Sequence, residues 1–379
     1  MNGRAVALGL TELWRTPGRT LLTAGVLSVL LFLTLTLAGL ADALDRGSTG
    51  VLRSLDADIV VFNEEARLQL LRSRVPRPMT LGAAFVDGVA QVGTLALVPT
   101  SAETPNGRVR VTLVGFSATT PAEPTTLVEG RLPVDGEPGI AAVDVALRSH
   151  GVRLGDRLVL AGEREVEVVG FVEDSTFLQQ PTVWVPPDVW ARVQVSAFPE
   201  AGFAEQLVGA TVIRTRPSAD PTGVAVAIEA EFEDLQAVPL RQAVLAIPGV
   251  DVQRRTFAVL VAMSVAVLSL VVGLLFALLV TERRSRWATL RALGAPRELL
   301  VATLLVQGVV LWMLALVGGS LGTALLARVV PDAMPLDLRL PVVGLVGIAS
   351  LVATVVGSSV ALGRVARTDP AAAMSEGAR

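Results

Sequence analysis

A short basic segment, residues 281–297 (TERRSRWATLRALGAPR), constrains the fold of this chain most, because it separates two long apolar runs. Residues 257–280 before it carry no charge, and residues 299–327 after it are apolar apart from Gln307. A helix needs about twenty apolar residues to cross the hydrocarbon core of a membrane. The pattern therefore predicts two membrane-spanning helices joined by a hairpin, and the five arginines of the hairpin place it in the cytoplasm.

The hairpin has the pattern of a short amphipathic helix. Trp287, Leu290, Leu293 and Gly294 recur at helical spacing, while most of the arginines lie on other faces. Gly294, with Pro296 two residues later, ends the helix. The arginines could simply satisfy the positive-inside rule. The apolar face favours a helix on which a cytoplasmic partner docks.

The composition excludes several classes of protein. Because 52% of its 379 residues are hydrophobic, the chain is too apolar for an ordinary soluble protein. It has no cysteine, which excludes disulfides and thiolate metal sites, and it has no lysine. A P-loop needs a lysine on the β- and γ-phosphates of the nucleotide. This chain therefore cannot carry that ATP site, and any ATP hydrolysis belongs to another polypeptide.

The single histidine offers little for catalysis. His150 precedes Gly151 at a predicted helix end and has no cysteine or carboxylate at a ligand spacing. It is better explained as a helix-end residue than as a metal ligand or a catalytic base. We therefore expect no catalytic, cofactor-binding or metal-binding residue in this chain, and no nucleic-acid partner.

The first 41 residues predict an uncleaved membrane anchor with a cytoplasmic N-terminus. Residues 1–19 have one apolar face and suit an amphipathic helix on the cytoplasmic membrane surface, and residues 20–41 form the first span. A signal peptide is the competing interpretation, since residues 41–43 mimic a cleavage site. The apolar run is too long for such a peptide, and its leader contains Glu12 and Trp14. An uncleaved anchor is therefore favoured.

Residues 42–255 form a single large insertion of soluble composition, which must lie outside because arginines hold both neighbouring spans inside. Mixed strand and helix patterns predict an α+β extracytoplasmic domain of two lobes, divided near residues 119–129. Strand patterns fall at residues 58–62, 92–98, 108–116, 157–160, 165–172, 182–185 and 210–214, and helix patterns fall at residues 64–74, 141–150 and 221–235.

The remaining segments complete a predicted bundle of four transmembrane helices with the α+β domain between the first and the second. Such a chain is a multi-pass protein of the cell membrane with both termini in the cytoplasm. The expected segments are span 256–280, coupling helix 281–297, span 298–327, external loop 328–339, span 340–362 and cytoplasmic tail 363–379.

Polar and small residues inside the spans predict helix packing. Gln307 is expected to hydrogen-bond to another helix, with a substrate contact as the alternative. Gly318 and Gly322 form a G-x-x-x-G pattern, and Gly357 belongs to a second row of small residues. They are expected to pack helices within one subunit, with a dimer contact as the alternative.

Four motifs resemble the MacB-, FtsX- and LolC-like class of ABC permeases. The hairpin is similar to the family pattern E-R-x-x-E-I-x-x-L-R-A-[LI]-G-A, except that Arg286 and Trp287 replace its acidic-apolar pair. The other motifs are LWRTPGRTLLT at the first span, LGD followed by VVG in the insertion, and RVARTDPAAAM in the tail. The opening LDADIVVF also resembles the glycolipid-exporter subgroup of cyanobacteria. The residues predicted to couple this hairpin to an ATPase are Glu282, Arg283, Arg286, Trp287, Leu290, Arg291, Leu293 and Gly294.

The resemblance implies the permease subunit of an ABC transporter. Such a subunit pairs with a second copy of itself and with a separate ATPase that binds the ATP. By mechanotransmission it would export or extract a lipid, lipoprotein, peptide or drug, with a periplasmic adaptor or lipoprotein as an outer partner. The alternative is a non-transporting regulator that activates an extracytoplasmic cell-wall hydrolase. The large insertion favours binding of a cargo or an adaptor.

Overall fold

The computed structural model describes residues 11, 13–161, 164–197, 207–282, 297–329 and 339–366. The chain divides into two compact units, Met1–Ala43 with Arg255–Arg379 and Leu44–Arg254, which we call the membrane unit and, after its predicted location, the outer unit. The predicted surface helix before residue 11, most of the hairpin, most of the external loop and the tail after residue 366 lie outside the described residues.

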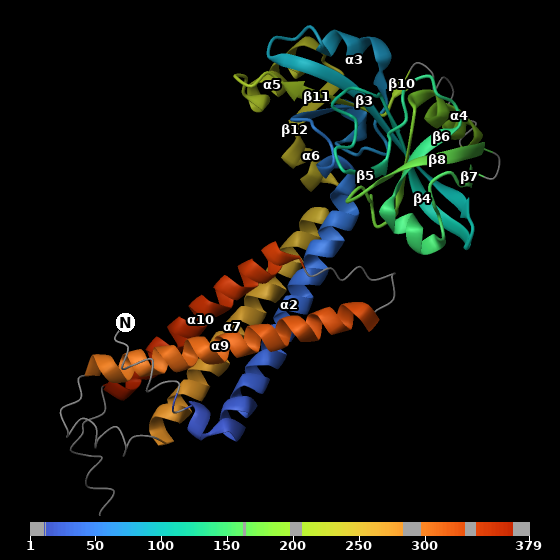
Figure 1. The fold of residues 1–379 in the computed structure, drawn as a ribbon. Coiled ribbons are helices and arrows are strands. Elements are labelled where there is room, and N and C mark those ends of the chain that lie inside the picture. The colour runs from blue at the N-terminus through green and yellow to red at the C-terminus, as the bar shows by residue number, and fades with distance from the viewer. Residues whose placement is uncertain are drawn as a thin grey trace, which may run out of the picture. The chain divides into compact units, whose positions relative to one another are not determined.

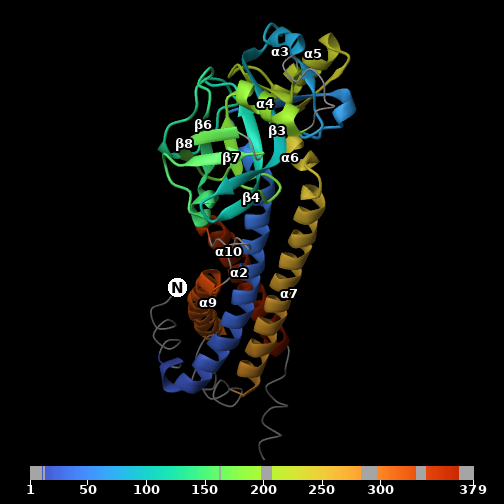
Figure 2. The same cartoon turned by 90° about the vertical axis from the view of Figure 1, so that its right-hand side faces the viewer.

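The membrane unit is built from long apolar helices (Figures 1 and 2). They are α2 (Pro17–Arg53), α7 (Val250–Glu282), α9 (Arg297–Val329) and α10 (Leu340–Ala366). The first three are long and apolar enough to cross a membrane, and α10 contains the shorter apolar stretch Leu340–Val356. The predicted fold class, a membrane helix bundle with a large outer domain after its first helix, is confirmed.

Apolar side chains and a few polar pairs hold the helices of the membrane unit together. The hydroxyls of Thr36 on α2 and Thr323 on α9 lie 3.3 Å apart. Trp312 of α9 donates from Nε1 to the hydroxyl of Ser350 on α10 at 2.9 Å. Polar side chains within a bilayer are enriched where they bond across helices. The apolar core of the unit contains Ala24, Leu27, Leu31, Leu35, Leu268, Val272, Phe276, Leu304, Leu311, Ala315 and Val346.

The outer unit is organised around one mixed sheet of ten strands, in the order β12-β1-β11-β3-β4-β9-β6-β8-β5, with β7 paired to β3 and β8. The strands are β1 (Ile59–Asn63), β3 (Val89–Thr104), β4 (Gly107–Phe116), β5 (Leu127–Gly130), β6 (Ile140–Asp144), β7 (Arg157–Leu160), β8 (Arg164–Val172), β9 (Thr182–Val185), β11 (Ala210–Thr215) and β12 (Leu235–Pro239). A second, two-stranded sheet pairs β2 (Val75–Pro76) with β10 (Leu207–Val208).

Part of the large sheet closes on itself. Strand β7 pairs with both β3 and β8, so the strands β3, β4, β9, β6, β8 and β7 form a closed ring of pairings. Closure removes the unpaired edges that an open sheet would leave. The ring surrounds an apolar core that includes Val98, Leu113, Val143, Leu160 and Val168.

Strands β1, β11 and β12 bury both faces of the sheet, and because successive side chains of a strand point to opposite faces, neighbouring residues join different cores. On β1, Val60 and Phe62 join one core, while Ile59 and Val61 join another. The helices α3 (Arg77–Ala83), α5 (Pro221–Glu231) and α6 (Leu240–Ala246) pack against this part, whereas α4 (Pro187–Ala197) packs against β3 and β4 and joins the core of the ring. Two short 3-10 helices are η1 (Glu64–Ala66) and η2 (Val145–His150).

Two of the predicted helices are wrong in whole or in part. Residues 141–144 belong to the buried strand β6, and only the following six residues form η2. Residues 64–74 contain only the single turn η1, because Arg67 and Leu68 adopt positive φ angles of 49° and 61° that stop it. The third predicted helix ends at Glu231, before β12. The two-lobe division stays a prediction.

Gly50 on α2 provides a test of the packing in the outer unit. A Cβ at this position would lie 2.6 Å from the backbone oxygens of Asp174 and Thr176. Overpacking of this kind costs about 1–3 kcal/mol, which exceeds the roughly 1 kcal/mol that alanine gains over glycine in a helix. We expect Gly50→Ala to lower the thermal unfolding midpoint of the full chain in detergent, followed by tryptophan fluorescence.

The matched control is Gly25→Ala in the same helix, where a Cβ would meet nothing within 4 Å. This variant should be as stable as the parent or slightly more so. Equal stability of the two variants would contradict the close contact between α2 and the segment around Asp174.

Candidate functional site

The predicted coupling helix lies largely outside the described residues. Glu282 is the last residue of α7, and α9 begins at Arg297. The other seven predicted coupling residues, which stay a prediction, are Arg283, Arg286, Trp287, Leu290, Arg291, Leu293 and Gly294.

The two glycines of the G-x-x-x-G pattern face α2 of the same chain. A Cβ at Gly318 would lie 2.5 Å from the hydroxyl oxygen of Ser28, and one at Gly322 would lie 3.0 Å from the ring of Phe32. Together with Val29, these residues line an open groove of about 470 Å³ between α2 and α9. Small residues allow such close approach of two membrane helices. Whether the glycines also serve a dimer contact stays a prediction.

The other residues predicted to act inside the spans, Gln307 and Gly357, lie on α9 and α10. Gln307 is buried, with 1% of its surface exposed. Within the described part of the chain, no group of three or more His, Cys, Asp or Glu side chains could hold a metal ion.

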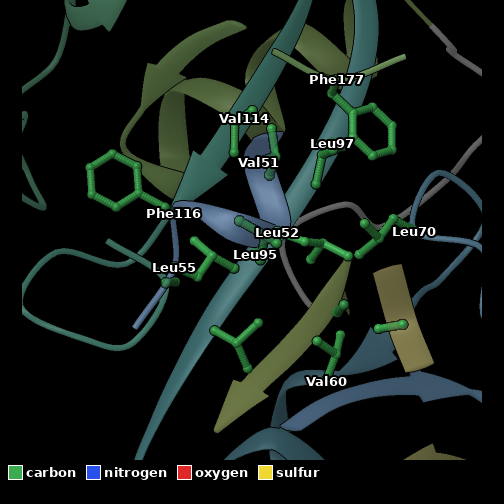
Figure 3. Packing of buried hydrophobic residues seen from close by; sticks show 14 of the residues in the cluster. Val51, Leu52, Leu55, Val60, Leu70, Leu95, Leu97, Val114, Phe116 and Phe177 are labelled. Atoms are coloured by element: carbon green, nitrogen blue, oxygen red, sulfur yellow. The ribbon is translucent and has the colours of Figure 1, made fainter. Parts of the chain in front are cut away.

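Within the outer unit, contacts gather around the end of α2, and we call residues 44–53 with these contacts the joint. The division between the units falls within α2 and within α7, so each of these helices contributes residues to both units. Figure 3 shows Val51 and Leu52, at the end of α2, among the apolar side chains of β3 and β4. Both are fully buried. Burial of a whole aliphatic side chain contributes about 1.5–3 kcal/mol, so these residues fix the end of α2 in the core of the outer unit.

A loop between β8 and β9, residues 174–180, holds the same end of α2 from the side, and we call it the clasp loop. The amide of Gln179 donates to the backbone oxygen of Leu44 at 2.7 Å and to the hydroxyl of Ser48 at 3.0 Å. The backbone amide of Val51 donates to the oxygen of Thr176 at 3.3 Å. Because Gly47 has no side chain, Gln179 can lie directly against the helix.

The clasp loop has an unusual backbone. Asp174, Leu178 and Gln179 have φ angles of 50°, 48° and 63°. Positive φ is uncommon for residues other than glycine, and such conformations persist where the surrounding contacts over-determine them. Here the contacts with α2 supply that constraint.

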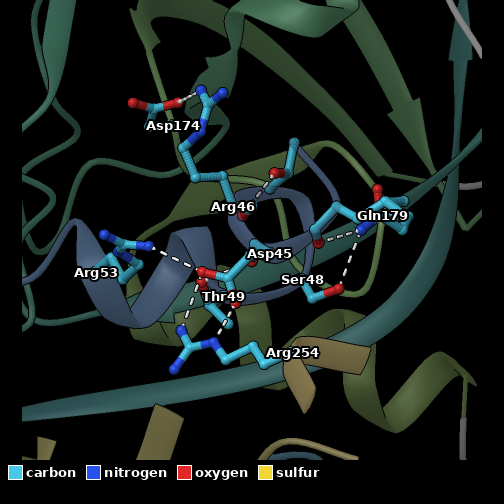
Figure 4. A network of polar contacts seen from close by, with 10 residues as sticks. Asp45, Arg46, Ser48, Thr49, Arg53, Asp174, Gln179 and Arg254 are labelled. Carbon is cyan, nitrogen blue, oxygen red and sulfur yellow. Dashed lines mark hydrogen bonds and ion pairs between the residues drawn. The ribbon is translucent and has the colours of Figure 1, made fainter. Parts of the chain in front are cut away.

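Asp45 connects the two helices that enter the outer unit (Figure 4). Arg254 of α7 donates to its carboxylate from Nε at 2.5 Å and from Nη2 at 3.0 Å. Arg53, two turns further along α2, donates to it at 3.1 Å. On the opposite side, Arg46 pairs with Asp174 of the clasp loop at 3.3 Å. A carboxylate held by two guanidinium donors of one arginine has a defined geometry as well as a favourable energy.

The joint was not predicted from the sequence, because the predicted first span ended with the apolar run. The available signal lies in residues 41–53, where Leu44, Ser48 and Val51 continue the helical spacing beyond the span. The pairing of Asp45 with Arg254, by contrast, joins residues more than two hundred positions apart and has no local signature.

Asp144 connects the clasp loop to the ring. It is almost fully buried at the end of β6, where its side chain accepts from the backbone amide of Ala146 at 2.8 Å and caps η2. Ser175 of the clasp loop donates to its other oxygen at 2.6 Å. Burial raises the pKa of Asp144, and the hydrogen bonds from Ser175 and Ala146 oppose this shift.

Comparison with known proteins assigns most of the membrane unit to a described family. The family described as "FtsX-like permease C-terminal" matches residues 257–370. Residues 257–370 form an FtsX-like permease domain. This match covers α9, α10 and most of α7, together with the hairpin that carries the resemblance. The predicted FtsX-like permease domain is thus confirmed for these residues, and the glycolipid-exporter subgroup is not.

Relatives of the permease match along nearly its whole length. An uncharacterized ABC transporter permease of Mycobacterium bovis is 29% identical over 365 residues, which cover 95% of this chain and 96% of the relative. A permease of the same description from Mycobacterium tuberculosis is 28% identical over 351 residues, covering 90% and 91%.

Solved structures also match the permease. The periplasmic region of MacB from Actinobacillus actinomycetemcomitans aligns with a TM-score of 0.38 and 13% identity, over 52% of this chain and 96% of that one. The extracellular domain of the transporter YknZ from Gram-positive bacteria aligns with a TM-score of 0.35 and 15% identity, over 48% and 98%.

The contact between Asp45 and Arg254 can be measured with a double-mutant cycle. We expect Asp45→Asn and Arg254→Gln in the permease to be coupled by about 1 kcal/mol, since the side chains are 15% and 36% exposed and the contact is bidentate. The measurement is chemical unfolding of the single and double variants in detergent. The matched control is Arg53→Gln, whose side chain is 51% exposed and makes a single contact. A coupling no larger than that of the control would show that Asp45 does not link α2 to α7.

The raised pKa of Asp144 predicts a pH dependence of stability. A group whose pKa is higher in the folded than in the unfolded protein stabilises the fold fully below its unfolded pKa of about 4, and this contribution is lost as the pH rises through the folded pKa. Asp144→Asn removes that dependence. The variant should therefore gain stability relative to the parent as the pH rises above this value, in thermal unfolding of the permease across a pH series.

Ser175→Ala serves as the companion variant. It removes a hydrogen bond that lowers the pKa of Asp144, so it should extend the loss of stability to higher pH. If the unfolding midpoints of the parent and of Asp144→Asn changed in parallel with pH, the account of Asp144 would be wrong.

Proposed function

We propose that this permease works as a homodimer with two copies of a separate ATPase and passes the movement of the ATPases to its outer units. The observation that carries the proposal is the joint. Both α2 and α7 are continuous between the units, and Asp45 ties them together at the start of the outer unit. A helix whose end is buried in the core cannot slide past that core without exposing Val51 and Leu52. A displacement of the helix is therefore passed on to the sheet.

The ATPase is proposed to dock on the hairpin. The motif that runs from Glu282 to Gly294 falls inside the region matched by the family, and its apolar face suits a groove on a protein partner. The arginines of the hairpin, with Arg15 and Arg19 before the first span, support a cytoplasmic location for this face and for both termini. The protein then lies in the cell membrane with its outer unit on the far side.

The substrate is proposed to be handled on the outer side rather than through a polar channel. The stretches 21–40, 257–280, 299–327 and 340–362 contain no Asp, Glu, Arg or His. A polar pathway through the bilayer normally needs ionisable or strongly polar residues along it. Export or extraction of a lipid, lipoprotein, peptide or drug fits this arrangement, with an adaptor or lipoprotein as an outer partner.

The proposal is tested by assembling the permease with its candidate ATPase in nanodiscs. Leu290→Ala and Leu293→Ala should abolish stable assembly or reduce the effect of the permease on ATP turnover at least fivefold. The matched control is Leu321→Ala on α9, a leucine that is 59% exposed on the membrane unit. Normal assembly and turnover with the hairpin variants would contradict docking at this helix.

Movement of the outer unit can be followed in the same complex. The chain has no cysteine, so Phe85→Cys, at a position that is 89% exposed on the outer unit, places one spin label in each copy. The distance between the two labels should change when ATP is trapped on the ATPase. In Asp45→Asn, this change should be reduced while ATP turnover continues. A distance that stays constant in the parent complex would contradict mechanotransmission.

A further inference from the structure

The strand β5 ends the order of the large sheet, so one of its edges is unpaired among the described strands. All four of its residues, Leu127–Gly130, are exposed. Leu127 and Val128 are apolar, yet 40% and 53% of their surfaces are exposed. An unpaired edge presents backbone N–H and C=O groups that can accept another strand.

The shape of β5 favours a short partner segment over a second sheet. Its pairing with β8 shifts between Leu127 and Glu129, which leaves Val128 as a bulge without a residue opposite. Bulges and short length are features by which edge strands avoid pairing with copies of themselves. The edge still offers enough backbone groups for a few residues of an extended peptide.

A pocket of about 360 Å³ lies next to this edge. Its wall includes Glu129 of β5, Phe171 of β8, and Arg148, Arg153 and Leu154 from the segment between β6 and β7. Glu129 and Phe171 are opposite each other in the register of the two strands, so their side chains lie on the same face of the sheet. The pocket therefore opens on one defined face beside the free edge.

The charges of the pocket favour an acidic group. Arg148 lies over the ring of Phe171, with 4.3 Å from its guanidinium carbon to the ring centroid, and it pairs with Glu129. The negative charge of Glu129 is thus already engaged. Arg153 is exposed, and its guanidinium makes no hydrogen bond or ion pair within the described part of the chain. One positive charge in the wall remains available for a ligand.

We infer that β5 and this pocket form a binding site for an extended peptide segment of a partner protein, with an acidic side chain of that segment placed against Arg153. The segment would add to the sheet beside β5 as a new strand. A residue opposite Glu129 on the added strand would point to the same face as Glu129 and Phe171, which is the face of the pocket. The main chain would supply affinity, and the pocket would select the side chain.

This inference does not depend on the proposed coupling to an ATPase, because it concerns only binding to the outer unit. The probe is a displayed library of random octapeptides, selected on the full chain in nanodiscs without ATPase. The selected peptides are expected to share an Asp or Glu at one fixed position, flanked by β-branched residues. Their affinities are then measured by fluorescence anisotropy with synthetic peptides.

Two variants separate the backbone and the charge contributions. Val128→Pro removes the N–H of the bulge, a position at which a strand tolerates proline, and should weaken binding at least tenfold. Val128→Thr is the matched control and should bind as the parent does. Arg153→Glu reverses an exposed charge without touching the core, and it should weaken binding of acidic peptides about tenfold or more. The same peptides with Gln in place of the acidic residue should not respond to Arg153→Glu.

Three results would overturn the inference. The first is a selection that yields no binding peptide. The second is a set of peptides that lack a shared acidic position or that bind Val128→Pro as well as Val128→Thr. The third is a disulfide-linked dimer of a Val128→Cys variant that forms readily without peptide, which would assign the edge to a second copy of this chain.

Discussion

The end of α2 at Val51 and Leu52 is anchored by burial in the core of the outer unit, and the other contacts of the joint build on that burial. The same helix that is apolar through the membrane unit ends with Val51 and Leu52 fully enclosed by strands of the outer unit. Its apolar side chains therefore have a different environment in each unit. In the membrane unit, lipid and neighbouring helices cover them, and in the outer unit a water-excluding protein core does so. The hydrophobic effect fixes only the end in the outer unit strongly, because lipid is as apolar as the helix surface.

The other contacts of the joint have different roles. The clasp loop holds α2 by contacts of the Gln179 side chain and of its own backbone, which need Gly47 and Gly50 to be small. Asp45 orders α2 relative to Arg254 by a directional ion pair. Such pairs contribute little free energy when partly exposed, so their main effect is on geometry. In the membrane unit, close packing at Gly318 and Gly322 and a few hydroxyl contacts replace the hydrophobic driving force.

The ring of strands encloses a second apolar core of the outer unit. Asp144 lies between that ring and the clasp loop, since it accepts from Ser175 of the loop and caps η2. The segment that follows η2 supplies Arg153 and Leu154 to the pocket beside β5. A buried polar group of this kind is stable only when its hydrogen bonds are complete. Its bonds thus connect the segment beside the pocket to the segment that holds α2.

Local sequence patterns indicate the permease class and the order of the segments along the chain. Long uncharged runs identified the spans, the missing lysine excluded a P-loop ATP site on this chain, and the motif from Glu282 to Gly294 indicated the permease class. These features are local, so a single sequence is enough to read them. Strands such as Arg157–Leu160 and Thr182–Val185 were also predicted with their observed bounds, because their alternation and flanking turn residues are local signals.

The pairing of strands and the contacts around α2 depend on tertiary structure. Residues 141–144 read as the start of a helix, yet they form β6 because β8 and β9 pair with them on both sides. The short edge strand β5 has no sequence signal, since its pairing with β8 defines it. The joint likewise depends on residues distant in the chain, such as Asp45 with Arg254 and Gly50 with Asp174. Local patterns determine which segments are apolar or extended, whereas the choice of partner depends on which distant surfaces the folded chain brings together.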